Sequence, residues 1–169
     1  MHMGYAIAAV TVICAVAYFV WLEIRGQRMW VVSQHTYEGF PLLLRHVDRL
    51  PFPSRRKRLP KLAIITHTFA KRRSDGLPDP DYNNGLFDLD MALIDAMKLD
   101  GVGTPVLIET FGGKRMFYYY VADQPSAEGR FQDVKRLFDG EELSFDCRAD
   151  PEWGFIQRYA KDYFPDLPF

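Results

Sequence analysis

A pair of adjacent glycines, Gly112-Gly113, interrupts a stretch of β-branched and aromatic residues at positions 104–121. Two glycines supply the positive φ angles that a two-residue hairpin turn needs, so the stretch predicts a β-hairpin. On its second strand, Met116, Tyr118 and Tyr120 alternate with residues that are apolar or aromatic as well. A strand without a polar face is typical of the centre of a sheet that is covered on both sides.

Strand and helix patterns alternate around this hairpin. Alternating apolar residues predict strands at 61–69 and 143–148, and apolar stripes at helical spacing predict helices at 86–99 and 125–139. The order strand, helix, strand, strand, helix, strand is the split βαβ, or ferredoxin-like, arrangement. Right-handed crossovers would place 61–69 and 114–121 in the centre of the sheet, with both helices on one face. The expected fold class is therefore α+β with an antiparallel sheet.

Two further segments flank this unit. Residues 29–47 predict another hairpin, with its turn at Glu38-Gly39. Asp150-Pro151-Glu152 predicts the start of a C-terminal helix, because it combines a capping residue, a proline and an early acid. The apolar stripe of that helix consists of Trp153, Ile156, Ala160 and Tyr163. The face of the sheet that carries Tyr118 and Tyr120 must be covered by the N-terminal hairpin, by the last helix or by a partner.

The segment at residues 5–22 contains no charged side chain, and Thr11 is its only clearly polar residue. As a helix it would span about 27 Å, close to the hydrocarbon thickness of a bilayer, and Tyr18 and Trp21 suit the membrane interface. A cleaved signal peptide is the alternative, because Ala15-Val16-Ala17 has the small-x-small form of a cleavage site. No basic region precedes the apolar run, and the run continues past this motif, so we favour an uncleaved transmembrane anchor.

This anchor divides the chain into residues 1–28, with the transmembrane helix and a basic flank, and an α+β domain at 29–169. Arg25 and Arg28 follow the apolar run, whereas no lysine or arginine precedes it. The positive-inside tendency therefore predicts a single-pass protein of the inner or plasma membrane, with its C-terminal domain in the cytoplasm.

Composition narrows the class of protein further. The 169 residues are 48% hydrophobic and 25% charged, which is typical of a folded domain. A net charge of −1 provides no bulk attraction to nucleic acid or to an anionic membrane. The two cysteines, Cys14 and Cys147, lie in the predicted anchor and in a predicted strand, so we expect no disulfide framework.

Several short motifs resemble those of a known family. They are Gly76-Leu77-Pro78, the helix after Asn84-Gly85, the Gly112-Gly113 hairpin and Asp150-Pro151-Glu152-Trp153. With these motifs the chain resembles the bacterial family catalogued as domain of unknown function 695, over about residues 30–165. The N-terminal anchor is an addition to that resemblance. The family has no established activity, so the resemblance implies no catalytic residue.

Groups that could bind a metal or catalyse a reaction fit ordinary structural roles better. His35, His46 and His67 lack the spacing of a metal motif and are interpreted as strand histidines. The acids in and beside a loop predicted at 70–85 do not follow a calcium-loop register, and turn and cap chemistry explains them: Asp75, Asp79, Asp81, Asp88 and Asp90. We therefore predict no metal, no cofactor and no catalytic residue, and a non-catalytic protein is favoured over an enzyme.

Two basic clusters lie before and after the predicted strand at 61–69. The first contains Arg55, Arg56, Lys57 and Arg58, and the second is Lys71-Arg72-Arg73. Nine extended residues span about 30 Å, so the clusters are expected at opposite ends of the domain, where one of them at most can face a membrane. The first cluster is either a solvated run of charge or a contact with anionic lipid headgroups.

Three functional hypotheses follow. The first is a membrane-anchored, non-catalytic interaction or regulatory module that binds a protein partner through an open sheet face, at Met116, Tyr118 and Tyr120, or through a sheet edge. The second is an enzyme with a site in the loop at 70–85. The third is single-stranded RNA binding on the aromatic strand at 114–121. Nucleic acid is the least favoured partner, because the glycines of the RNA-recognition signature are absent from that strand.

Overall fold

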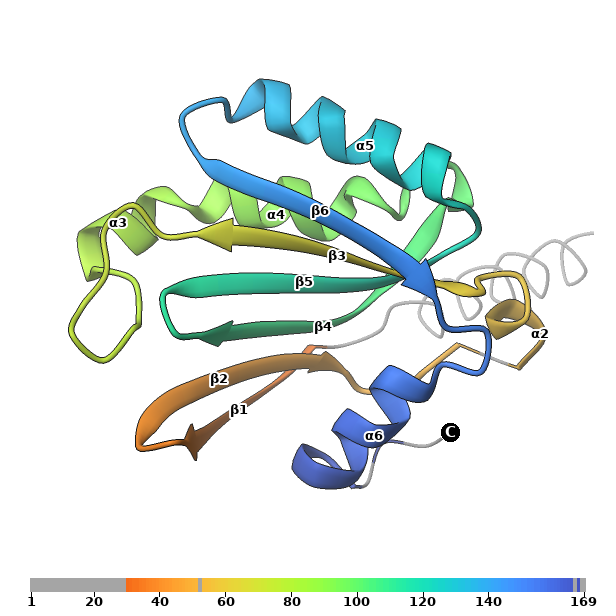
Figure 1. Ribbon diagram of the computed structural model, residues 1–169, viewed down its shortest axis with the longest axis horizontal. Helices are drawn as coiled ribbons and strands as arrows, with labels where there is room; N and C mark the ends of the chain where they lie inside the picture. Colours follow the sequence, from red (N-terminus) through yellow and green to blue (C-terminus); the bar gives the residue numbers. More distant parts are fainter. Residues whose placement is uncertain (1–29, 52, 166, 168–169) are drawn as a thin grey trace, which may run out of the picture.

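The computed structural model describes residues 30–51, 53–165 and 167, and Figure 1 shows how they are arranged. The strands are β1 (Trp30–Tyr37), β2 (Phe40–Val47), β3 (Lys61–Thr68), β4 (Gly103–Phe111), β5 (Lys114–Val121) and β6 (Glu142–Ala149). The helices are α2 (Pro53–Arg56), α3 (Pro80–Gly85), α4 (Phe87–Ala96), α5 (Gln124–Leu137) and α6 (Gly154–Tyr163), with a 3-10 turn at Leu99–Gly101. Together they form an α+β fold, as predicted.

The six strands form one antiparallel sheet in the order β1-β2-β4-β5-β3-β6. Strands β3 and β5 lie inside the four-stranded unit, where the pattern of residues 61–148 places them. Both predicted hairpins are present. Their turns use positive φ angles at Glu38 (52°) and Gly39 (82°), and at Gly112 (59°) and Gly113 (86°). The N-terminal hairpin extends the sheet beyond β4 and makes β1 one of its two edges.

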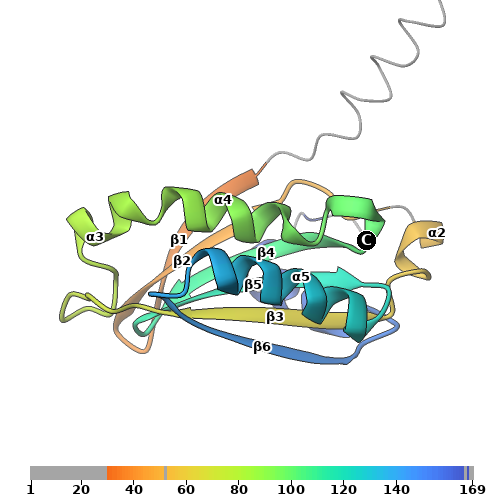
Figure 2. The same ribbon diagram turned by 90° about the horizontal axis from the view of Figure 1, so that it is seen from above.

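Helices α4 and α5 cover one face of the sheet, as Figure 2 shows. The core on this face joins Leu93 of α4 and Phe131 of α5 to Phe117 and Tyr119 of β5, and all four are buried. The phenol of Tyr119 donates a hydrogen bond to the Leu93 carbonyl oxygen over 2.6 Å, so its polar end is satisfied inside the core. The prediction that both helices lie on one face of the sheet is confirmed.

Helix α6 covers the opposite face. Trp153 stacks on Tyr120 with 3.7 Å between ring centroids, and its indole nitrogen donates to the Leu59 carbonyl oxygen at 3.0 Å. Ile156 and Ala160 complete the contact and are 0% and 1% exposed. The sequence left three candidates to cover this face: the N-terminal hairpin, the last helix and a partner. In the structure the last helix packs over Tyr120.

The predicted start of the last helix was too early. The residues at 150–152 form a turn, and α6 begins at Gly154, after Trp153 has adopted a left-handed φ of 59°. Asp150 still acts as a cap, because its carboxylate accepts from the backbone N–H groups of Gly154 and Phe155 at 2.8 and 3.0 Å. The turn lets the chain reverse over the sheet and insert the indole before the helix starts.

The loop predicted at 70–85 contains helix α3, which was not predicted. Asp79 caps this helix by accepting from the backbone N–H groups of Asp81 and Tyr82, and a proline occupies its first turn. The remaining loop packs on the central hairpin turn, where Gly113 donates its N–H to the Gly76 carbonyl oxygen at 2.8 Å. The helix predicted at 86–99 ends earlier, at Ala96.

The predicted anchor at residues 5–22 lies outside the described residues. None of the helices in the described part of the chain is long and apolar enough to cross a membrane.

Candidate functional site

The two ends of the sheet differ in character (Figure 1). At one end, which we call the turn end, lie the turns at 38–39 and 112–113, the loop at 70–79 and helix α3. At the other, the α2 end, lie α2 and the start of β1, because Trp30 pairs with Val47 and α2 follows Val47 by a few residues.

A buried ion-pair network lies near the turn end, under α3 and α4. Arg115 of β5 donates to both carboxylate oxygens of Asp90 at 2.7 and 2.6 Å, to Asn83 Oδ1 at 2.7 Å and to Thr110 Oγ1 at 3.2 Å. Its guanidinium also lies 5.5 Å from the centre of the Phe69 ring. The Arg115 side chain is 9% exposed, so these bonds satisfy a charge that has lost most of its water.

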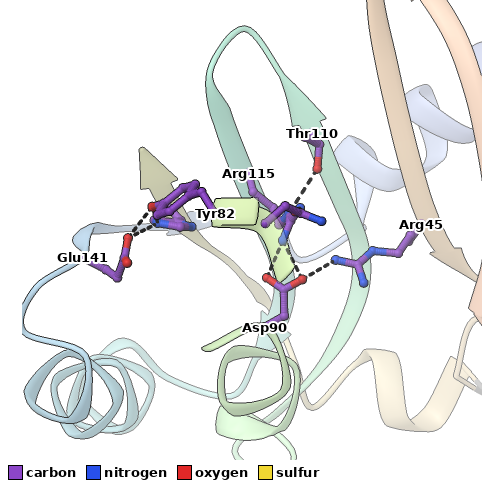
Figure 3. Close-up of polar contacts among 8 residues, drawn as sticks. Arg45, Tyr82, Asp90, Thr110, Arg115 and Glu141 are labelled. Carbon is purple, nitrogen blue, oxygen red and sulfur yellow. Dashed lines mark hydrogen bonds and ion pairs between the residues drawn. The ribbon is translucent and has the colours of Figure 1, made fainter. Parts of the chain in front are cut away.

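A second arginine reaches the same carboxylate from the N-terminal hairpin. Arg45 of β2 donates to Asp90 Oδ2 at 3.1 Å, and its side chain is 32% exposed. Figure 3 shows Arg45 and Arg115 converging on Asp90. The three charged residues belong to three elements that are far apart in the sequence, and together they join the hairpin to the helix layer.

The outer side of this network opens into a cleft of about 370 Å³ between the N-terminal hairpin and the α3–α4 segment. We call it the hairpin cleft. Its lining residues are Val32, Ser33, Gln34, Leu43, Arg45, Asn83, Asp90 and Arg115. Two arginines and one aspartate leave the lining with a net charge of +1, so the cleft suits a negatively charged group.

A second polar cluster lies beside the first, because His67 of β3 pairs across strands with Arg115. His67 is fully buried, and its Nε2 atom lies 2.8 Å from Glu141 Oε2 and 3.2 Å from the Tyr82 hydroxyl. The Tyr82 hydroxyl donates to Glu141 at 2.5 Å and accepts from the backbone N–H of Ala70. Figure 3 shows Tyr82 and Glu141 together, to one side of Asp90.

The bonds of this cluster define its protonation. Burial, and then the bond to Glu141, raise the pKa of Tyr82 to about 12, so the phenol stays a donor at neutral pH. The carboxylate accepts at Oε2, which requires the proton of His67 to sit on Nε2. Nδ1 of His67 finds no hydrogen-bond partner among the described residues. A proton on Nδ1 would be a buried donor without a partner, whereas a proton on Nε2 is donated to Glu141. The cluster therefore pins α3 to the sheet, and Tyr82 is not an activated nucleophile.

The three residues predicted as an interaction face lie on the side of the sheet that α6 covers. Tyr118 and Tyr120 are 6% and 0% exposed, and Met116 is half-buried against the same core. These side chains form the interior between the sheet and α6, so they do not present a surface to a partner. The burial also removes the aromatic rings that base stacking on β5 would use.

A buried carboxylate on this face was missed by sequence reasoning. Glu109 of β4 is 9% exposed and accepts a hydrogen bond from the Tyr159 hydroxyl of α6. Burial raises the pKa of Glu109, and the bonds from Tyr159 and Tyr118 oppose that rise in part. The bond ties α6 to the sheet.

The acids and histidines that the sequence singled out are distributed over separate sites. Asp79 caps α3, and Asp75 accepts from the backbone N–H of Leu77 and pairs with Arg73. His46 stacks on Phe164 at 4.2 Å, and His35 contacts Tyr163. Within the described residues, no three His, Cys, Asp or Glu side chains gather closely enough to hold a metal ion.

The two basic clusters occupy opposite ends of the sheet, where Figure 1 shows α2 and the loop at 70–79. In the first cluster, Arg55, Lys57 and Arg58 are exposed and Arg56 is half-buried. This cluster lies at the α2 end, which is also the end where β1 begins.

The edges of the sheet are not equivalent. Edge strand β6 carries Glu142, Asp146 and Arg148, all exposed. Edge strand β1, WVVSQHTY, has neither charged residues nor proline, and its Val32 is 69% exposed. Charge and proline are the usual means by which proteins protect an edge from pairing with another chain, so β1 is the unprotected edge.

The comparison with known families decides the relationship of this chain. A model described as a family of unknown function (DUF695) matches residues 28–159, most of the chain. The chain belongs to the DUF695 family. No curated protein and no solved structure matches the chain.

The motifs that resemble DUF695 are structural in this domain. Gly76 has a φ of 83°, and a Cβ atom built there would lie 3.2 Å from the Gly112 Cα atom. Trp153 and Asp150 build the turn before α6 and contact Tyr120, whose hydroxyl donates to Asp150 at 2.6 Å. These motifs hold the fold together and identify no reaction.

Proposed function

We propose that this DUF695 domain is a membrane-tethered, non-catalytic interaction module that binds an extended segment of a partner protein along the free edge of β1. The observation that carries the proposal is the contrast between the two sheet edges. An extended peptide can add a strand to an exposed edge, where backbone hydrogen bonds supply affinity and side-chain pockets supply specificity. Strand β1 offers that edge without charge or proline, whereas β6 is guarded by three charged residues.

The turn of the N-terminal hairpin determines which groups of β1 are available. In a two-residue hairpin the residues that flank the turn form a hydrogen-bonded pair, here Tyr37 and Phe40. By alternation along the strand, the N–H and C=O groups of Val32, Gln34 and Thr36 point away from β2. Their side chains share the face on which Arg45 lies, because Val32 pairs directly with Arg45.

The tether is the second part of the proposal. We propose that residues 5–22 cross the inner or plasma membrane, with Arg25 and Arg28 on the cytoplasmic side. The position of the basic cluster at Arg55–Arg58 supports this, because it lies at the end of the sheet where the chain enters the domain. Juxtamembrane arginine and lysine side chains favour anionic headgroups.

The tether is tested by fractionation and by lipid binding. The full chain should stay in the membrane pellet after an alkaline carbonate wash, and a fused C-terminal reporter should respond as a cytoplasmic protein. Replacing Arg55, Lys57 and Arg58 by Gln should weaken contact with vesicles that contain anionic lipid. The same change at Lys71, Arg72 and Arg73, at the turn end, should not. Recovery of the full chain in the soluble fraction would refute the tether.

The binding edge is tested by selection from a displayed library of random twelve-residue segments, with the full chain in lipid nanodiscs as bait. We expect enrichment of segments that alternate β-branched and polar residues. Val32→Glu places a charge on the free edge and should abolish their binding. Ser144→Glu places the same charge on β6 and should leave it unchanged. Equal binding to both variants would contradict the proposal.

A further inference from the structure

The hairpin cleft lies beside the edge to which the proposed segment would bind. Val32 and Gln34 line the cleft and also belong to the outward-facing residues of β1. A strand added outside β1 would therefore direct every second side chain over the same face, next to Val32 and Gln34. These side chains of the added strand would lie at the mouth of the hairpin cleft.

The cleft has a positive charge that its own residues do not balance. Asp90 serves both arginines, and Arg115 takes the larger share, with two bonds to its carboxylate at 2.7 and 2.6 Å. Arg45 makes one bond, at 3.1 Å, from a side chain that is 32% exposed. The guanidinium of Arg45 is thus held in place by Asp90 while part of it faces the cleft.

The distance from the free edge to Arg45 suits a long acidic side chain. Neighbouring strands lie about 4.8 Å apart, so a strand outside β1 lies about 10 Å from β2. An arginine and a glutamate side chain can together span that distance when both lie on the same face. The uncharged surface of Val32 between them excludes water from one side of the pair.

We propose that the segment bound along β1 carries a glutamate, or an aspartate, on the face of the sheet that α4 and α5 cover. Its carboxylate pairs with Arg45 in the hairpin cleft. This inference rests on the proposed function, because it names the chemistry of the partner at the same edge. Backbone pairing on β1 supplies the docking. The carboxylate selects acidic segments and fixes their register, since a shift by one residue would move it to the other face.

The test repeats the library selection with variants of the cleft. Against the wild-type full chain in nanodiscs, enriched segments should carry one acidic residue at a constant place in the alternation. Arg45→Met should remove the preference for that acid and keep the alternation. Arg49→Met is the matched control, because Arg49 follows the same strand and pairs with Asp48 at 3.6 Å, away from the cleft lining.

Affinities of one enriched segment complete the test. Arg45→Met should weaken binding of the acidic segment about tenfold, which corresponds to about 1.4 kcal/mol. It should not change the affinity of the same segment with glutamine at the acidic position. Enrichment of alternating segments without an acid, or an equal loss for both segments, overturns the inference and leaves the proposed function standing. If no segment depends on Val32, both are refuted.

Discussion

The two arginines that share Asp90 should differ widely in their contribution to stability. Arg45 is 32% exposed at the side chain, Arg115 is 9% exposed and Asp90 is 15% exposed. An exposed ion pair contributes about 1 kcal/mol or less. Removing one partner of a buried pair costs about 3–5 kcal/mol, because the other charge is left without compensation. Burial therefore predicts a ranking of three substitutions.

Asp90→Asn should be the most destabilising, at about 3–5 kcal/mol, because it leaves the Arg115 guanidinium buried without a carboxylate. Arg115→Met should cost less, since Asp90 keeps its bond to Arg45. Arg45→Met should cost about 1 kcal/mol or less. A domain of this size has a total stability of about 5–15 kcal/mol, so the first substitution removes a large share of it.

The ranking is measured by urea unfolding of the full chain in detergent, followed by near-ultraviolet circular dichroism. The buried pair of Trp153 and Tyr120 provides the signal. The double variant Asp90→Asn, Arg115→Met gives the sharpest result. It should be more stable than Asp90→Asn alone, because it removes the unpaired charge. If the double variant is less stable than the single one, the unpaired arginine is not the source of the cost, and the reasoning fails.

Two further predictions concern strain and titration. Gly76→Ala should lower the melting temperature more than Gly39→Ala. Both glycines have a positive φ (83° and 82°), but only at Gly76 would an added Cβ atom meet the Gly112 backbone. Equal losses in melting temperature would exclude that contact as the cause. Glu109→Gln should raise the free energy of unfolding at pH 7, because burial raises the folded-state pKa of Glu109 above 4.5, and the ionised carboxylate is then costly. This advantage should shrink as the pH of the unfolding experiment falls through the raised pKa towards 4.5, since the native state binds the proton more readily, and an advantage that grows on acidification would contradict it.

Much of the secondary structure and of the strand order follows from local sequence signals. The two hairpins were predictable because their turn residues, Glu38-Gly39 and Gly112-Gly113, adopt the positive φ angles that such turns need. The central position of β5 followed from the absence of a polar face. Both signals act within a few residues, so they need no knowledge of the tertiary fold.

The polar network was missed because its members meet only through the tertiary fold. Arg45, Asp90 and Arg115 come from the hairpin, α4 and β5. A usable signal was nevertheless present. Asp90 is flanked at four residues on either side by Leu86 and Ile94, and both are buried. A charged residue within an apolar helical stripe indicates a buried partner.

Helix α3 and the start of α6 were misjudged for a related reason. The run of Asp, Pro and Asn before Gly85 is typical of a loop, yet Asp79 and the following proline also form a good helix start. The bonds of Tyr82 to His67 and Glu141 hold this short helix against the sheet. Tertiary contacts of this kind outweigh local propensity, and single-residue preferences do not reveal them.

The two parts of the proposed function limit each other. Residues 23–29 separate the predicted anchor from β1, and seven residues span at most about 25 Å even when fully extended. A tethered domain would therefore hold the start of β1 within about that distance of the bilayer. Any segment that pairs with the free edge must reach the same zone, which favours a partner that is itself bound to the membrane. Moving the edge away, by inserting a long flexible linker after Arg28, should weaken binding to a membrane-bound partner and leave binding to a free peptide unchanged.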